Sequence, residues 1–173
     1  MTRLLALALL FAALGAQDQN GELRLQWTRS FPPRTTAWEF TPKMVRDTAY
    51  EPVVAGGLVF VGCEHDGALV ALDCSTGEER WRYYTEGPIR VAPVADGSRV
   101  LVGSQDGQLY ALDLQGRLQW KMRGGPSVRR ILGHERLISA WPTSAKPVVQ
   151  EGKVFVVAGY WPLDGIFVHA IDA

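Results

Sequence analysis

The side chains that could bind a metal or act as nucleophiles are few in this sequence, and their spacing limits the chemistry they can perform. Three histidines, His65, His134 and His169, stand far apart and show none of the short spacings that zinc sites require. No Ser-His-Asp set, carboxylate pair or glycine-rich phosphate loop stands in a context that supports catalysis. We therefore predict no catalytic residue and no metal ligand in this chain.

The two cysteines, Cys63 and Cys74, could form a disulfide in an oxidising compartment. The apolar runs on either side of residues 64–67 predict a β-hairpin in which Cys63 lies opposite Ala68 and Cys74 lies near Gly57. The two sulfur atoms would then be on the order of 20 Å apart, at about 3.3 Å per residue, which is beyond disulfide reach. We expect both cysteines to be small buried apolar residues.

Several arginine and tryptophan side chains could line a pocket: Arg90, Arg129, Arg130, Trp141 and Trp161. Loops on a rigid framework are where binding residues usually lie. Arginine and tryptophan in such loops nevertheless pack or stay solvated more often than they bind a ligand. The cofactor-binding residues therefore remain unassigned at the level of the sequence.

These side chains lie on a framework that repeats about every 40 residues. The segment that begins at Pro52 recurs from Pro93 and again from Pro147, and each copy contains a turn followed by an apolar run. An Asp-Gly pair followed by another apolar run recurs at 66–73, 106–113 and 164–172. Self-similarity at a fixed period predicts an array of similar supersecondary units.

Each unit predicts four short strands, because β-branched and aromatic runs alternate with Gly, Asp and Ser turns and no window fits a helix. The expected strands lie near 50–54, 57–63, 68–73 and 78–83 in the first unit, and near 91–94, 99–103, 108–112 and 117–121 in the second. Four antiparallel strands in about 40 residues form one propeller blade. We expect an all-β fold of β-propeller blades, each of four antiparallel strands, in an incomplete ring of about three blades.

A motif near the end of each unit resembles that of a known family. The first copy contains Ala71, Asp73, Thr76, Gly77 and Trp81, and the shorter copies contain Ala111, Asp113, Gly116, Trp120, Ala170 and Asp172. This spacing resembles the tryptophan-docking motif of the pyrroloquinoline quinone (PQQ)-like β-propeller repeat family, which includes quinoproteins and an outer-membrane assembly scaffold. The third copy stops before its Gly and Trp, so we expect an N-terminal fragment of a longer protein.

The side chains of the motif have a structural use that does not depend on the resemblance. Asp73 can accept backbone N–H groups and close a turn, and Gly77 can adopt the positive φ that such a turn requires. Trp81 can cover the gap between neighbouring sheets. We assign these residues to blade packing and not to catalysis.

The resemblance implies two alternative functions. A quinone dehydrogenase needs PQQ at the propeller axis, calcium held by oxygen ligands, a catalytic Asp and an adjacent Cys pair, whereas Cys63 and Cys74 are not adjacent. We therefore expect a non-catalytic binding or scaffold module without a cofactor. The alternative is the N-terminal part of a PQQ- and calcium-dependent dehydrogenase.

The N-terminus predicts export. Arg3 precedes an apolar stretch and the small residues Gly15 and Ala16, which together are typical of a signal peptide over residues 1–16, cut after either small residue. We expect a periplasmic or extracellular chain with no membrane span after cleavage. Residues 17–51 then form an N-terminal segment with a partial blade ending at Trp27, and residues 52–173 carry the truncated PQQ-like repeats.

Net charge and loop length limit the class of partner. The 18 basic and 18 acidic residues balance, so the chain has no broad positive surface for a nucleic acid. About fifteen extra residues separate the second unit from the third, and the central hairpin of the third unit is also longer. We expect a protein or a glycan to bind through these loops.

Overall fold

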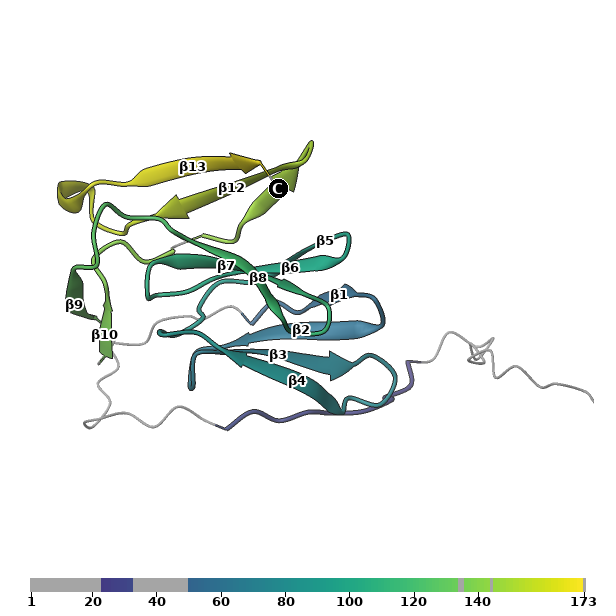
Figure 1. Ribbon diagram of the computed structural model, residues 1–173. Coiled ribbons are helices and arrows are strands. Elements are labelled where there is room, and N and C mark those ends of the chain that lie inside the picture. The colour runs from purple at the N-terminus through teal and green to yellow at the C-terminus, as the bar shows by residue number, and fades with distance from the viewer. Residues whose placement is uncertain (1–22, 33–49, 134–135, 144, 173) are drawn as a thin grey trace, which may run out of the picture.

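The computed structural model describes residues 23–32, 50–133, 136–143 and 145–172 of the chain (Figure 1). The predicted signal peptide and most of the segment 17–51 lie outside these residues. The described part is built from strands in four antiparallel sheets. None of its helices is long and apolar enough to cross a membrane.

The first two repeat units each form one four-stranded antiparallel sheet, as predicted. The first sheet contains β1 (Val53–Ala55), β2 (Leu58–Cys63), β3 (Ala68–Asp73) and β4 (Glu79–Tyr84). The second contains β5 (Val94–Asp96), β6 (Arg99–Gly103), β7 (Gln108–Asp113) and β8 (Leu118–Arg123). The largest shift from the prediction is at β5, which starts after Pro93 because proline has no N–H to donate to a strand ladder.

The third unit forms a three-stranded sheet of β11 (Val148–Gln150), β12 (Lys153–Ala158) and β13 (Phe167–Asp172), with a short 3-10 helix, η2 (Pro162–Asp164), between β12 and β13. The extra residues before it, expected as a loop, contain a separate hairpin of β9 (Arg130–Gly133) and β10 (Arg136–Ser139). The insertion is therefore an ordered element and not an irregular connection.

The three larger sheets lie one above the other (Figure 1). Their facing side chains form the core. Phe60, Leu69 and Ala71 of the first sheet pack against residues of the second that include Val102 and Leu112. The opposite face of the second sheet packs against β12 in the same way. This arrangement is an all-β arc of about three propeller blades, and the described residues do not close it into a ring.

The register of the first hairpin explains the state of the two cysteines. Cys63 lies opposite Ala68, and the backbone N–H of Cys74 donates to the carbonyl of Gly57 at 2.9 Å, as the sequence predicted. Both cysteines are free. Cys63 is buried, but the expectation that Cys74 is also buried is wrong, because it lies in the turn after β3 with its side chain exposed to solvent.

Candidate functional site

Two tryptophans dock on the neighbouring blade in the same way. Nε1 of Trp81 donates to the carbonyl of Leu114 at 2.8 Å, and the indole lies so close to Gly116 that an added Cβ would be 2.7 Å from the ring. The segment 23–32 repeats this contact on the first sheet, where Nε1 of Trp27 donates to the carbonyl of Cys74 at 3.0 Å and the ring covers Gly77. The Trp81 indole therefore joins the first blade to the turn of the second, and the Trp27 indole joins the segment 23–32 to the turn of the first.

Trp27 was assigned to a partial blade and was missing from the predicted docking set. Its segment forms no regular strand, yet Trp27 and Phe31 cover the outer face of the first sheet. A signal was present in the sequence, because residues 24–27 and 117–120 share the same four letters, RLQW. The number of residues between each tryptophan and the glycine that it covers is not constant along the sequence. The repeat therefore did not show that Trp27 has the same role as Trp81.

An aspartate holds the turn under each indole, which we call the docking turn. Oδ1 of Asp73 accepts the backbone N–H groups of Ser75 at 2.9 Å and Thr76 at 3.0 Å. The Ser75 hydroxyl, followed by the guanidinium of Arg80, holds the pKa of Asp73 well below its usual range. Gly77 closes the turn with a φ of 71°.

The second copy of the turn has the same plan. Oδ1 of Asp113 accepts the backbone N–H groups of Gln115 at 3.0 Å and Arg117 at 2.9 Å, and Gly116 has a φ of 83°. The second turn is one residue shorter and has no counterpart of Thr76 before its glycine. The Arg117 side chain donates to Oδ2 of Asp113 at 2.7 Å.

A β-bulge connects each aspartate to its tryptophan. In the first sheet Ala71 pairs with Trp81 and Leu72 pairs with Glu79, so Arg80 has no partner across the ladder. Its guanidinium instead binds Oδ2 of Asp73 at 2.8 Å. The second sheet has the same bulge at Gln119, whose amide donates to Oδ2 of Asp113 at 3.2 Å.

The small residue opposite each indole completes this unit. Ala71 and Ala111 are both fully buried and lie directly across the ladder from Trp81 and Trp120. In the third sheet Ala170 pairs with Phe155, and both Ala170 and Asp172 are exposed. The predicted docking residues thus come together in the first two sheets and form packing contacts there.

The opposite end of the sheets carries the turns 64–67, 104–107 and 159–166, and we call it the loop face. An aspartate lies in each turn and is engaged within the chain. Asp66 forms an ion pair with Arg82, and Asp164 forms one with Arg129. Asp106 accepts the Tyr110 hydroxyl at 2.5 Å and the backbone N–H groups of Gln108 and Glu86. Burial raises the pKa of Asp106, and these hydrogen bonds oppose that effect.

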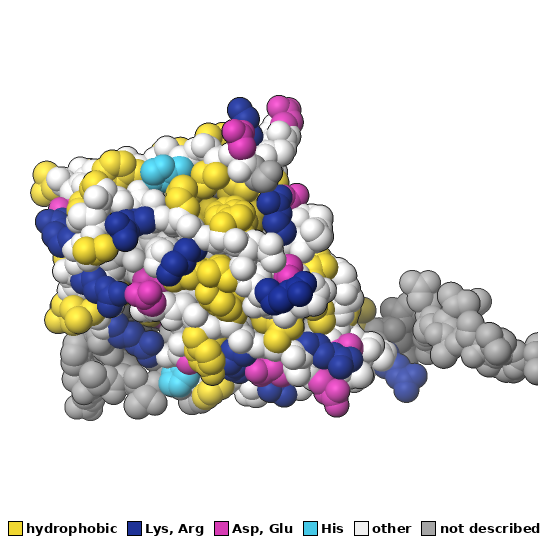
Figure 2. Space-filling view, in the orientation of Figure 1, with side chains coloured by type: hydrophobic (Ala, Val, Ile, Leu, Met, Phe, Trp, Pro, Cys, Tyr) yellow, Lys and Arg dark blue, Asp and Glu magenta, His cyan; other side chains and the backbone are white. Residues whose placement is uncertain are grey.

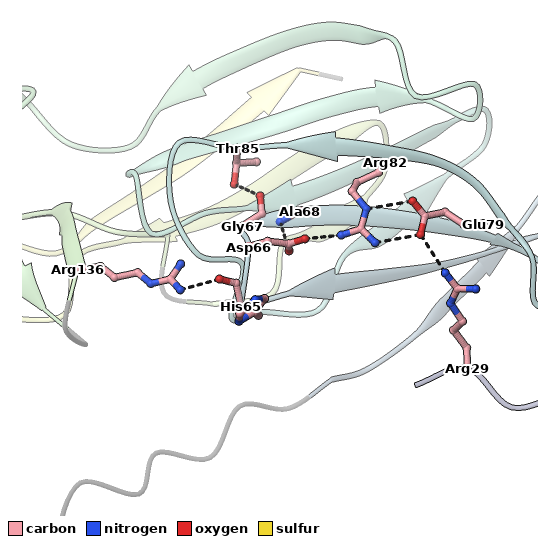
Figure 3. A network of polar contacts seen from close by, with 9 residues as sticks. All are labelled: Arg29, His65, Asp66, Gly67, Ala68, Glu79, Arg82, Thr85 and Arg136. Atoms are coloured by element: carbon pink, nitrogen blue, oxygen red, sulfur yellow. Dashed lines mark hydrogen bonds and ion pairs between the residues drawn. The ribbon is translucent and has the colours of Figure 1, made fainter. Parts of the chain in front are cut away.

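A network of ion pairs extends from the first of these turns (Figure 3). Arg82 lies between Asp66 and Glu79, and it contacts the Glu79 carboxylate at 2.9 and 3.0 Å. The hydrogen bonds that Arg82 donates to Glu79 are the main cause of the raised pKa of Arg82. Arg136 of β10 donates to the His65 carbonyl at 2.6 Å, so the inserted hairpin is attached to the first blade.

The arginines considered for a cofactor pocket are engaged elsewhere. Arg90 and Glu64 form a buried pair at 3.4 Å, and Arg130 pairs with Glu86 at 2.8 Å. Arg129 lies 5.0 Å from the centre of the Trp141 ring and also pairs with Asp164. These groups are therefore distributed over several local contacts.

The aromatic and histidine candidates are also dispersed. Trp141 is buried and donates to the Asp164 carbonyl at 2.6 Å, whereas Trp161 is 55% exposed. His169 contacts the Gly124 carbonyl at 2.8 Å, and His134 lies outside the described residues. The described residues contain no cluster of His, Cys, Asp and Glu that could hold a metal ion.

The loop face also has a shallow groove of about 330 Å³ between β8 and the start of β9. Its charged lining consists of Lys121, Arg123, Arg130, Glu86 and Asp106. Lys and Arg side chains gather on this side of the molecule, with hydrophobic side chains among them (Figure 2). The sequence analysis did not single out Lys121 and Arg123, because a strand position alone does not show that they face a groove.

Similar sequences are found among proteins of two functions. An outer membrane protein assembly factor BamB from Nitrosomonas eutropha is 28% identical over 114 residues, which are 66% of this chain and 28% of that protein. The dehydrogenase subunit of a quinone alcohol dehydrogenase from Gluconobacter oxydans is 28% identical over 150 residues, 79% of this chain and 19% of that protein. The chain thus spans less than a third of these curated relatives.

Solved structures show the same fold. BamB from Moraxella catarrhalis aligns with a TM-score of 0.53 and 23% identity over 70% of this chain and 32% of that chain. A quinohemoprotein alcohol dehydrogenase from Pseudomonas putida HK5 aligns with a TM-score of 0.55 and 23% identity over 70% of this chain and 18% of that chain.

A family model described as outer membrane protein assembly factor BamB matches residues 24–140. The matched region includes the first two blades, both complete docking turns and the inserted hairpin. Because this match covers more than half of the sequence, the chain belongs to this BamB-type family of PQQ-like β-propeller repeat proteins.

Proposed function

We propose that the chain is a non-catalytic scaffold module that acts outside the cytoplasm and binds a partner protein through its loop face. The observation that carries this proposal is the contrast between two sets of side chains on that face. The aspartates and arginines that could serve a cofactor are paired within the chain, whereas Val128, Leu132 and Leu137 of the insertion are 71%, 73% and 63% exposed. Exposed aliphatic side chains that gather on one element mark a protein contact surface.

A protein fits this surface better than a glycan, because the exposed hydrophobic side chains of the inserted hairpin are aliphatic and not aromatic. The membership in a family named for outer membrane protein assembly supports a binding role. The signal-peptide pattern over residues 1–16 supports a position outside the cytoplasm.

The second candidate function is that of a PQQ- and calcium-dependent dehydrogenase, which the similarity to the Gluconobacter oxydans enzyme favours. PQQ is a flat, multiply charged anion and would need free cations beside an open aromatic surface. Among the described residues, Arg129 is already ion-paired with Asp164 and lies over Trp141, which is buried. These residues do not fit the cofactor, so we derive no step through it.

The two functions can be separated by a dye-reduction assay on the protein purified from its host. The assay supplies PQQ, CaCl₂ and a series of primary alcohols, with a known quinone alcohol dehydrogenase as the positive control. The scaffold proposal predicts no alcohol-dependent reduction above the rate without protein. Alcohol-dependent dye reduction that requires both PQQ and calcium would establish the dehydrogenase and overturn the proposal.

A further inference from the structure

Strand β9 lies on the loop face and has one edge that no described strand pairs with. The backbone N–H of Ala140 donates to the carbonyl of Arg129 at 2.9 Å, which makes this a hydrogen-bonded pair of the β9–β10 ladder. Because such pairs alternate in an antiparallel ladder, the backbone groups of Arg130 and Leu132 point away from β10. The Ser139 N–H, which also points away from its partner strand, donates to the Gln105 carbonyl at 2.8 Å.

The edge of β9 differs from that of β10 in having no partner in the described part of the chain. Among the described residues, no backbone hydrogen bond is made by the N–H or C=O groups of Arg130 or Leu132 along this edge. An edge strand with free backbone groups can accept an extended segment of another protein as an added strand. The edge of β10, in contrast, already rests on the turn 104–107.

The side chains beside this edge determine which segment would fit. Leu132 and Leu137 lie directly opposite each other in the ladder and are 73% and 63% exposed, so they form an apolar pair on the outer face of the hairpin. Arg130 lies on the same face as Leu132, two residues earlier along β9, and its side chain is 47% exposed. An added strand would therefore place an aliphatic side chain beside Leu132 and the next residue on the same face beside Arg130.

The charge of the adjoining groove favours an acidic segment. Lys121 and Arg130 share one carboxylate, that of Glu86, at 3.9 and 2.8 Å. Arg123 has no acidic partner among the described residues, and Asp106 is occupied by hydrogen bonds from Tyr110 and the backbone. Cations therefore exceed available carboxylates in the groove that adjoins β9.

We propose that β9 takes up an extended acidic segment of a partner protein as an added strand. The segment alternates so that an aliphatic side chain packs on Leu132 and Leu137 and a carboxylate lies near Arg130 and Arg123. This inference rests on the proposed scaffold function and specifies its partner by chemistry. The backbone of the segment would bond to the free groups of Arg130 and Leu132.

The probe is a fluorescent peptide of eleven residues in which glutamate alternates with valine and leucine, measured by anisotropy against the full protein. A second peptide in which lysine replaces every glutamate is the charge control. The acidic peptide should bind at least tenfold more tightly than the lysine peptide, and its affinity should fall as NaCl is raised. Equal binding of both peptides, or no saturable binding of the acidic one, would overturn the inference.

Two variants at one position separate the backbone contact from the side-chain contact. Leu132→Ala removes the aliphatic side chain and should weaken peptide binding about threefold. Leu132→Pro also removes the outward N–H, leaves the bonds to β10 in place, and should weaken binding about tenfold more than Leu132→Ala does. Equal affinities of the two variants would show that no strand is added.

Charge variants test the groove independently of the backbone of β9. Arg123→Glu should weaken binding about fivefold or more, whereas Lys153→Glu, an exposed lysine on β12 away from the loop face, should stay within about twofold of wild type. Unchanged binding by Arg123→Glu would contradict the role of the groove. If the wild-type protein does not bind the acidic peptide and also does not reduce the dye, this inference alone is refuted. Alcohol-dependent dye reduction would instead refute the proposed function itself.

Discussion

Gly116 shows how a single residue holds two blades together. A Cβ added there would lie 2.7 Å from Cδ2 of Trp81. The backbone of Gly116 has a φ of 83°, which residues other than glycine rarely adopt. The indole can reach the turn and bond to Leu114 only because this position has no side chain. The contact between blades therefore depends on glycine at this position.

Substitution of this glycine tests the docking contact. Gly116→Ala should lower the free energy of unfolding by about 2–4 kcal/mol, since the strain of a positive φ adds to the overlap with Trp81. Gly97→Ala is the matched control, because Gly97 has a φ of 57° but nothing within 4 Å of its added Cβ. Urea unfolding of both variants measures the difference, and equal losses would show that the indole does not depend on the glycine.

The two cysteines should differ in reactivity. Cys63 is buried, and this burial raises the pKa of its thiol to about 11, so the thiol is protonated at neutral pH. The side chain of Cys74 is exposed to solvent. A thiol-specific reagent at pH 7.5 should label one cysteine, Cys74, in the folded protein and both in urea, as counted by mass spectrometry. A Cys74→Ser variant is the control and should remain unlabelled when folded; rapid labelling of Cys63 would contradict its burial.

At the scale of single residues, the spacing in the sequence singled out the aspartates, glycines and tryptophans of the repeated motif for blade packing, and it left Trp27 out of that set. It did not predict the exposure of Cys74, because burial at a turn depends on how the turn packs against its neighbours. It also did not predict the pairing of Arg129 with Asp164, which joins residues 35 positions apart. Ion pairs across an insertion have no local pattern in the sequence.

At the scale of elements, the sequence predicted the strands of the repeats but missed the inserted hairpin. The strands β2, β3, β6 and β7 are apolar runs that are buried on both faces between blades, which gives a strong signal. Strands β9 and β10 have four residues each and carry arginines and exposed leucines. Such short amphipathic strands have no counterpart in the other units, so the repeat could not reveal them.

The segment 23–32 acts as a packing element although it forms no regular strand. Trp27→Ala should lower the free energy of unfolding by about 1–3 kcal/mol, because it removes a half-buried indole and its hydrogen bond to Cys74. Trp161→Ala should change it by less than about 0.5 kcal/mol, since Trp161 is 55% exposed. Chemical denaturation compares the two, and an equally small effect of Trp27→Ala would show that the segment does not stabilise the first blade.

At the scale of the whole molecule, one sheet face has no neighbour among the described residues. Val148, Phe155 and Val168 of the third sheet are 54%, 37% and 71% exposed. Phe155 pairs with Val148 and Ala170. Leu101 has the equivalent position in the ladder of the second sheet, and there it is buried against β12. The face thus has the pattern of a blade contact but is open to solvent.

This open face should make the 173-residue chain self-associate. Val168→Lys places a charge on the apolar face and should shift sedimentation toward the monomer, with little effect on folding because the side chain is exposed. Val128→Lys, at an equally exposed valine on the loop face, is the matched control. Association that persists in Val168→Lys and is lost in Val128→Lys would place the self-contact on the loop face instead.

The location of the partner site is tested most directly by photo-crosslinking in the host. A photoreactive amino acid is placed at Val128 on the loop face or at Gln115, which is exposed in the docking turn at the opposite end of the sheets. The scaffold proposal predicts a discrete crosslinked protein from position 128 and none from position 115. A crosslink from position 115 alone, or none from either position, would contradict a partner site on the loop face.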